Sequence, residues 1–180
     1  MTYTKHYTSP LGMILLAADD AGLTGLWFEG SKYFAAELPK EHTEQDTPVL
    51  LETTQWLDVY FAGKEPDFTP LLHLVGSDFR QAVWNILLSI PYGRTMTYGQ
   101  IAKQLAKNTG IDKMSAQAVG GAVGHNPISI IVPCHRVVGT NGSLTGYAGG
   151  LDRKIKLLEL EKADMRQLFV PCQEHRLIKL

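Results

Sequence analysis

Cysteine is scarce in this sequence. Only Cys134 and Cys172 occur among the 180 residues, so at most one disulfide could form. Small secreted proteins that depend on disulfides carry more of them. We therefore expect a cytoplasmic protein in a reducing compartment, with two free thiols available for chemistry.

Long apolar runs are absent too. Residues 1–10 lack the apolar core of a signal peptide, and no stretch comes near the length of about 20 apolar residues that a membrane-spanning helix needs. The longest aliphatic run, residues 128–132, is interrupted by one serine and predicts a short buried strand. The hydrophobic fraction of 44% and the charged fraction of 19% are typical of soluble globular proteins, which excludes a disordered or low-complexity chain.

An excess of positive charge is also missing, because the formal net charge is −1. The charge is unevenly distributed, however. Residues 1–75 carry 4 basic and 11 acidic side chains, residues 76–165 carry 10 and 6, and residues 166–180 carry 3 and 1. This asymmetry favours contact of the more basic part with nucleic acid. Because residues 76–165 have a net charge of only +4, we expect few phosphate contacts and a shallow salt dependence.

The first part of the chain predicts a small α/β domain at residues 1–70. Apolar runs on both sides of the Asp-Asp-Ala-Gly turn at residues 19–22 are typical of a β-hairpin. A helix is expected at residues 49–61, and the turn-rich residues 63–70 are the expected linker. The predicted apolar face of that helix consists of Leu50, Thr54, Leu57 and Phe61.

The second part predicts a mainly helical domain at residues 76–165, followed by a tail at 166–180. Helices are expected to begin at Ser77 or Asp78, at Thr97 and at Ser115, which are residue types that cap helix N-termini. The last two helices are short and joined by a turn that contains glycine, so they have the size of a helix-turn-helix. Ordinary helix pairs of other folds have the same pattern.

The third of these helices has an unusual surface of small residues. Glycine destabilises a helix interior by about 0.5–1 kcal/mol relative to alanine, so its presence calls for a reason. Either another helix packs closely here, or a ligand or a backbone comes very near. The small residues are Ala116, Ala118, Gly120, Gly121, Ala122 and Gly124.

A cysteine next to a histidine, Cys134-His135, is the sequence feature with chemical potential. A free thiol has a pKa of about 8.5, so a base that removes its proton makes it a much better nucleophile. Neighbouring side chains of an extended chain point to opposite sides, so His135 would reach Cys134 only through a turn, a water molecule or an irregular backbone. A buried structural cysteine beside a packed histidine is the alternative interpretation.

The motif around these two residues resembles the active-site signature of the O6-alkylguanine-DNA alkyltransferases, the methylated-DNA–protein-cysteine methyltransferases. It consists of Pro133-Cys134-His135-Arg136-Val137, preceded by Gly124-His125-Asn126-Pro127. Further matches include Tyr98-Gly99-Gln100-Ile101-Ala102, Thr145-Gly146-Tyr147-Ala148-Gly149-Gly150 and Leu157-Leu158-Glu159-Leu160-Glu161. They cover residues 76–165 in order, and the set is highly specific.

The resemblance implies an α/β fold: a small ribonuclease H-like domain, then a mainly helical domain with a winged-helix-like helix-turn-helix. It also implies a single-turnover repair reaction. The family rotates the damaged guanine of duplex DNA into a pocket, and a cysteine irreversibly takes the alkyl group from O6, with O4-alkylthymine as a further possible substrate. By resemblance Cys134 is the acceptor, His135 is the base acting through a water, and Glu161 orients His135. Tyr98 would donate to the guanine, and Asn126 would brace the turn beside the cysteine.

The resemblance also implies a set of DNA-binding and base-binding residues. Ala116, Ala118 and Gly120 match the part of the recognition helix that enters the minor groove, and Val137, Tyr147 and Ala148 match pocket positions. One position departs from the family, which usually has an arginine where this chain has Gln117. Glutamine lacks the charge and the forked donors of arginine, so it should offset less of the cost of base flipping.

Three other functions remain open on the sequence: a lesion-binding protein of the same fold that does not transfer, a cysteine hydrolase and a transcriptional regulator. The presence of Cys134 argues against the first, because alkyltransferase-like proteins replace that cysteine. The resemblance implies no cofactor and a monomer. A metal site built from Cys134, His135, Cys172 and His175 fits no standard zinc spacing, so no metal is expected.

Overall fold

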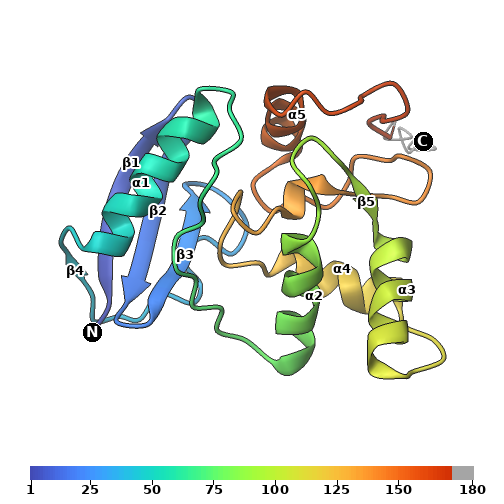
Figure 1. Cartoon of the computed structure of the whole chain (residues 1–180), viewed down its shortest axis with the longest axis horizontal. Coiled ribbons are helices and arrows are strands. Elements are labelled where there is room, and N and C mark those ends of the chain that lie inside the picture. The colour runs from blue at the N-terminus through green and yellow to red at the C-terminus, as the bar shows by residue number, and fades with distance from the viewer. Residues whose placement is uncertain (172–180) are drawn as a thin grey trace, which may run out of the picture.

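The computed structural model describes residues 1–171 and shows two parts side by side, a sheet with one helix and a cluster of helices (Figure 1). The sheet has the order β3-β2-β1-β4, formed by β1 Tyr3–Ser9, β2 Gly12–Asp19, β3 Gly22–Phe28 and β4 Thr43–Glu44. Neighbouring strands β1, β2 and β3 are antiparallel, while β4 lies parallel to β1. The predicted hairpin is therefore present as β2 and β3.

Both faces of the sheet are covered, which explains why β2 is an unbroken apolar run. Ile14, Leu16 and Ala18 belong to the main core, whereas Leu15 and Ala17 pack with Trp27 on the opposite face, under the segment that contains Ala35 and Leu38. The helix α1 Pro48–Phe61 contacts β1, β2 and β3.

The predicted face of α1 is only half right. Thr47 caps its N-terminus, and Leu50 and Leu57 are buried as expected. Thr54 and Phe61 are only partly buried, however, and the fully covered positions include Trp56 and Tyr60. The buried stripe is rotated because α1 contacts the second part of the molecule as well as the sheet: Tyr60 reaches the side chain of Glu161.

Three helices of the second part begin at the predicted places: α2 Asp78–Leu88, α3 Tyr98–Thr109 and α4 Ala116–Gly124. The part also contains α5 Leu151–Leu160 and the short parallel strands β5 Met96–Thr97 and β6 Val137–Val138. Ser77, Thr97 and Ser115 each accept a hydrogen bond from the first turn of the following helix. Helices α2, α3 and α4 contact one another. The pair α3 and α4, joined by residues 110–115, has the arrangement of a helix-turn-helix (Figure 1).

The prediction of a strand at residues 128–132 is wrong. The segment is buried but folds back on itself: the Val132 amide donates to the Ile128 carbonyl at 3.1 Å, and Ile130 has a φ of 70°. Only Ile128 forms a bridge, to Leu26 at the edge of β3. The cause is Asn126, whose side chain donates to the Val132 carbonyl at 2.7 Å and accepts from the Ile128 amide at 3.0 Å. These bonds hold the backbone in a turn, which the aliphatic run alone does not reveal.

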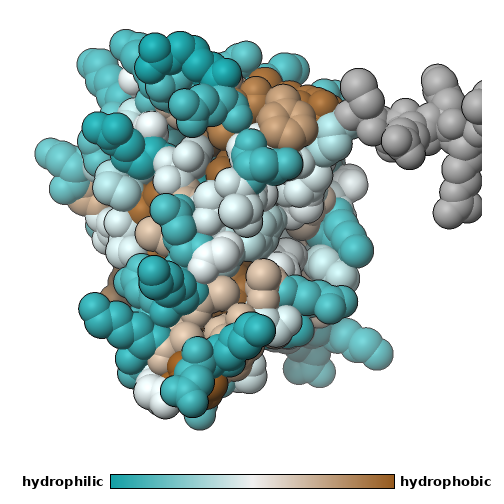
Figure 2. Space-filling view, turned by 90° about the vertical axis from the view of Figure 1, so that its right-hand side faces the viewer, coloured by the Kyte–Doolittle hydropathy of each residue, from teal (hydrophilic) through white to brown (hydrophobic). Residues whose placement is uncertain are grey.

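No helix within residues 1–171 is long and apolar enough to cross a membrane. The view onto the face that carries α3 and the turn after it shows hydrophilic side chains mixed with pale and apolar ones (Figure 2). Cys172, His175 and the rest of the tail from 172 onward lie outside the described residues.

Candidate active site

Cys134 begins a 3-10 helix, η1 Cys134–Arg136, directly after the buried turn and Pro133. This 3-10 turn is an irregular backbone of the kind considered for Cys134 and His135, whose side chains would point to opposite sides on an extended chain. It keeps three consecutive side chains inside the protein: the exposed fractions are 6% for Cys134, 0% for His135 and 8% for Arg136. The cysteine therefore lies just beneath the surface, with its histidine fully enclosed.

Glu161, the residue that caps the C-terminus of α5, is the centre of a buried polar cluster. Its side chain is 0% exposed and accepts five hydrogen bonds. Oε1 accepts from His135 Nε2 at 2.7 Å and from Arg136 Nη2 at 2.9 Å, and Oε2 accepts from Arg136 Nε at 2.9 Å. The remaining donors are the Tyr60 hydroxyl at 2.7 Å and the Gly93 amide at 3.1 Å.

This cluster fixes the protonation of His135. Burial alone would raise the pKa of the Glu161 carboxyl, but the hydrogen bonds and charges of His135 and Arg136 outweigh burial and hold that pKa well below its usual range. Burial lowers the pKa of His135, so its imidazole is neutral at pH 7. An ionised carboxylate only accepts hydrogen bonds, so Nε2 must carry the proton. Nδ1 is then an acceptor, and it has no hydrogen-bond partner within residues 1–171.

The thiol of Cys134 is protonated in this environment, because burial raises its pKa. The Asn126 side chain and the charge of Lys154 act in the opposite direction. Lys154 is 0% exposed, and its ammonium donates to the carbonyls of Val137 at 2.5 Å and Thr145 at 3.0 Å. Burial lowers the pKa of Lys154 to about 8. The site thus holds a thiol that needs a base, beside a neutral imidazole with a free lone pair.

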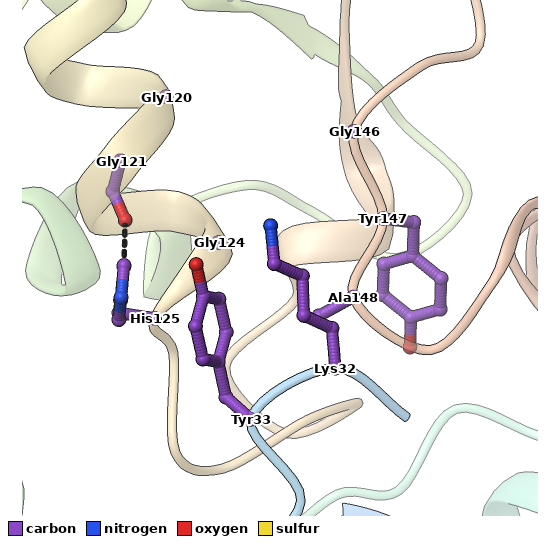
Figure 3. A pocket seen from close by; sticks show the side chains of 9 residues that line it. All are labelled: Lys32, Tyr33, Gly120, Gly121, Gly124, His125, Gly146, Tyr147 and Ala148. Atoms are coloured by element: carbon purple, nitrogen blue, oxygen red, sulfur yellow. Dashed lines mark hydrogen bonds between the residues drawn. The ribbon is translucent and has the colours of Figure 1, made fainter. Parts of the chain in front are cut away.

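A cavity of about 280 Å³ lies between α4 and the loop at residues 146–148. Figure 3 shows the glycine side of α4 on one wall and Tyr147 and Ala148 on the other. Tyr98 stands next to this cavity: a Cβ at Gly120 would be 3.9 Å from its Cε1, and a Cβ at Gly146 would be 3.0 Å from its hydroxyl oxygen. Burial raises the pKa of Tyr98 to about 12, and the charge of Cys134 adds to this rise. Tyr98 can therefore donate its proton in a hydrogen bond while remaining neutral.

The N-terminal part contributes a third wall that the sequence did not predict. The backbone amide of Lys32 donates to the Ala148 carbonyl at 2.9 Å, and the Tyr33 ring stacks on His125 with centroids 4.1 Å apart. In Figure 3 the side chains of Lys32 and Tyr33 extend from the segment after β3 toward the glycine side of α4.

The small residues of α4 other than Ala122 are exposed or only partly buried. Val119, Ala122 and Val123 are buried, whereas Ala116, Gln117, Ala118 and Gly121 are exposed. A Cβ added at Gly121 or Gly124 would meet no neighbouring atom within 4 Å. Close packing of another helix therefore does not account for this surface, and it is open to a ligand.

The structure brings together Cys134, His135, Glu161, Asn126 and Tyr98 in one region, and Gly120, Tyr147 and Ala148 around the adjacent cavity. Val137 is not among the residues that line the cavity; it is buried in β6, where its carbonyl accepts from Lys154. Sequence reasoning missed Tyr60 and Lys154. For Lys154 a signal existed: with Leu151, Leu158 and Glu161 it follows the helical spacing of three and four residues that marks a buried stripe. Within residues 1–171 no group of three or more His, Cys, Asp or Glu is arranged to hold a metal ion.

A helix-turn-helix beside a buried cysteine, histidine and glutamate is the arrangement expected of a DNA-binding protein that uses a cysteine in its chemistry. Comparison with known families agrees. Residues 2–74 match the ribonuclease-like domain of 6-O-methylguanine DNA methyltransferase, and residues 78–163 match its DNA binding domain. The chain belongs to the methylated-DNA–protein-cysteine methyltransferase family, and the predicted fold class is confirmed.

Curated relatives and solved structures cover nearly the whole chain. The methylated-DNA–protein-cysteine methyltransferase of Mycobacterium bovis is 45% identical over 163 residues, which are 91% of this chain and 94% of the relative. That of Methanosarcina acetivorans is 48% identical over 160 residues, 88% of this chain and 97% of the relative. The protein chain in a crystal structure of Mycobacterium tuberculosis OGT in complex with DNA is 44% identical in sequence. The match covers 89% of this chain and 92% of that chain, with a TM-score of 0.77.

Proposed function

We propose that this protein repairs duplex DNA by moving the alkyl group of O6-alkylguanine irreversibly to Cys134. The observation that carries this proposal is the state of the two ring nitrogens of His135. Its Nε2 is bound to the ionised Glu161 at 2.7 Å, and its buried Nδ1 has no hydrogen-bond partner within residues 1–171, so this atom can act as a base for the adjoining Cys134.

The reaction needs only groups of this chain. Nδ1 of His135 takes the thiol proton through a water, and the resulting imidazolium is stabilised by Glu161. The Cys134 sulfur then attacks the alkyl carbon, so the S–C bond forms while the O6–C bond breaks. The electron pair of the broken bond stays on the guanine, which accepts a hydrogen bond from Tyr98. The guanine then takes up a proton, and the His135 imidazolium gives its extra proton back to water, so that charge and protons balance. No step regenerates the thiol, so each protein molecule acts once.

DNA binding is assigned to the helix-turn-helix. The exposed small residues of α4, Ala116 and Ala118, let the helix approach the minor groove closely, with Gly120 at the cavity and Gln117 as the group that fills the gap left by the flipped base. Tyr147 and Ala148 bound the pocket, and the Val137 carbonyl holds the ammonium of Lys154. Asn126 braces the turn before Cys134.

The proposal includes the organisation of the whole chain. Residues 1–70 form the N-terminal domain, residues 76–165 the DNA-binding and acceptor domain, and residues 166–180 a tail. The protein acts as a monomer in the cytoplasm, and the transfer step needs no cofactor.

Mass spectrometry after incubation with an O6-methylguanine duplex tests the transfer. We expect the peptide that contains Cys134 to gain one methylene and the gain to saturate at one per chain. A lesion-binding protein without transfer would bind the same duplex and leave the peptide unchanged. A cysteine hydrolase would instead turn over small acyl substrates and show no response to DNA.

Replacing Gln117 with arginine should raise the rate of single-turnover repair or the affinity for the duplex. Gln117 is exposed on α4, and an arginine there adds a charge and five N–H donors toward the DNA. Lys40→Arg is the control in the same assay. It introduces an arginine at an exposed position of the N-terminal part without changing the net charge. Equal rates and affinities for wild type and Gln117→Arg would contradict the assignment of position 117.

A further inference from the structure

One residue of the active-site cluster comes from the N-terminal part of the chain. Tyr60 lies near the end of α1, is 0% exposed, and donates from its hydroxyl to Glu161 Oε1 at 2.7 Å. The same hydroxyl oxygen lies 3.5 Å from His135 Nε2. Tyr60 therefore touches both residues of the pair that prepares the nucleophile, although it is 75 positions away from His135 in the sequence.

Three donors share one oxygen of Glu161. Oε1 accepts from Tyr60, from His135 and from Arg136, at 2.7, 2.7 and 2.9 Å. Each additional donor spreads the negative charge of the carboxylate and weakens it as an acceptor for the others. The strength with which Glu161 stabilises a protonated His135 thus depends on what else the carboxylate binds.

The surroundings make His135 sensitive to this balance. The titratable and charged groups that act on it are Arg136 of η1, Lys154 of α5 and Glu161 at the end of α5. Tyr60 of α1 also lies against it, and Cys134 adjoins it in the chain. Arg136 and Lys154 lower the pKa of His135, and burial lowers it most. Glu161 is the group among them that raises it. Any donor that competes for Glu161 therefore favours the neutral imidazole.

We infer that Tyr60 is a positioning residue of the N-terminal domain that competes with His135 for Glu161 and so keeps the imidazole neutral and able to accept the thiol proton. This inference rests on the proposed role of His135 as the base. It gives the N-terminal domain a part in the chemistry, since α1 supplies a hydroxyl to the site of the other domain.

The chain offers a matched pair of variants. Tyr60→Phe removes the hydroxyl that binds Glu161. Tyr92→Phe makes the same chemical change in a ring that contacts Tyr60 edge-on, with centroids 6.1 Å apart, but the Tyr92 hydroxyl is buried and has no hydrogen-bond partner within residues 1–171. A general effect of losing a buried hydroxyl near the site would appear in both variants.

The test is the pH dependence of single-turnover methyl transfer between pH 5 and 9, together with an NMR titration of the His135 imidazole. Without Tyr60, Glu161 holds the imidazolium more strongly, so we expect the acid limb and the imidazole titration of Tyr60→Phe to move up by about 0.5–1 pH unit. Tyr92→Phe should keep both at the wild-type position.

Several results would overturn the inference. If Tyr60→Phe is less stable in urea but both titrations stay in place, the residue is only structural. A downward shift, or equal shifts in Tyr60→Phe and Tyr92→Phe, would also reject it. Failure of this inference can be told apart from failure of the proposed function. Methyl transfer by Tyr60→Phe at high pH would support the proposed function whatever the titrations show, whereas a wild-type protein that transfers no methyl group would reject that function.

Discussion

The Cys134→Ala variant should bind the O6-methylguanine duplex and transfer no methyl group. The variant lacks the sulfur that would form the S–C bond. Neither Lys154, whose ammonium donates to two carbonyls, nor Tyr98, which stays protonated, can take the methyl group in its place at neutral pH. The Cys134 side chain is small and only 6% exposed, so its truncation should cost about 1 kcal/mol of folding stability. Single-turnover transfer with labelled duplex and a binding titration measure the two properties separately.

Cys172→Ala is the control, because it removes the other cysteine of the chain. It should transfer at the wild-type rate. Methyl transfer by Cys134→Ala, or loss of transfer in Cys172→Ala, would reassign the acceptor. Loss of duplex binding in Cys134→Ala would mean that the thiol also takes part in holding the lesion.

Glu161→Gln should destabilise the protein strongly and slow transfer. The variant leaves the Arg136 guanidinium, which is nearly buried, without its counter-charge, and the amide nitrogen of glutamine cannot accept from His135, Arg136 or Tyr60. Breaking a buried ion pair from one side costs about 3–5 kcal/mol. That is a large share of a typical domain stability of about 5–15 kcal/mol. Urea unfolding at pH 7 measures this change.

Glu159→Gln is the matched control. It makes the same substitution two residues earlier, at an exposed position of α5, and should change the free energy of unfolding by no more than about 0.5 kcal/mol. Equal destabilisation by the two variants would mean that the cluster around Glu161 does not hold the domain together.

The same residues set the pH dependence of stability. The pKa of Glu161 is lower in the folded than in the unfolded chain, so its contribution is present at neutral pH and is lost as the pH falls below about 4.3. The pKa of His135 is also lowered by burial, so the unfolded chain binds a proton below about pH 6.5 that the folded chain does not. Both effects lower the free energy of unfolding as the pH falls. Wild-type stability should therefore fall in two stages on acidification, and Glu161→Gln should lack the lower one.

Local sequence predicted those features that local chemistry determines. The three caps Ser77, Thr97 and Ser115 begin helices because their side chains satisfy amides of the first turn. The hairpin of β2 and β3 follows from the two apolar runs and the turn between them. The motif around Cys134 supplied the family, which the comparisons confirm.

Long-range contacts explain what was missed. The segment at residues 128–132, predicted as a strand, is a turn because of hydrogen bonds from the Asn126 side chain. The buried face of α1 includes Tyr60 because its hydroxyl donates to Glu161, about 100 residues further along the chain. Neither interaction has a periodic signature. Lys154 does lie on the buried stripe of α5, but a lysine in a sequence is normally expected to be exposed to solvent.

The glycines of α4 have a consequence for the local stability of the DNA-facing helix. Gly120, Gly121 and Gly124 each weaken the helix by about 0.5–1 kcal/mol relative to alanine, so α4 is held by its buried residues, by Ser115 at its start and by Trp84, whose indole donates to the Ala122 carbonyl at 2.9 Å. Such a segment opens at lower free energy than the rest of its domain. Its amide hydrogens should therefore exchange with solvent sooner than those of α2, and DNA laid along its exposed side would slow that exchange.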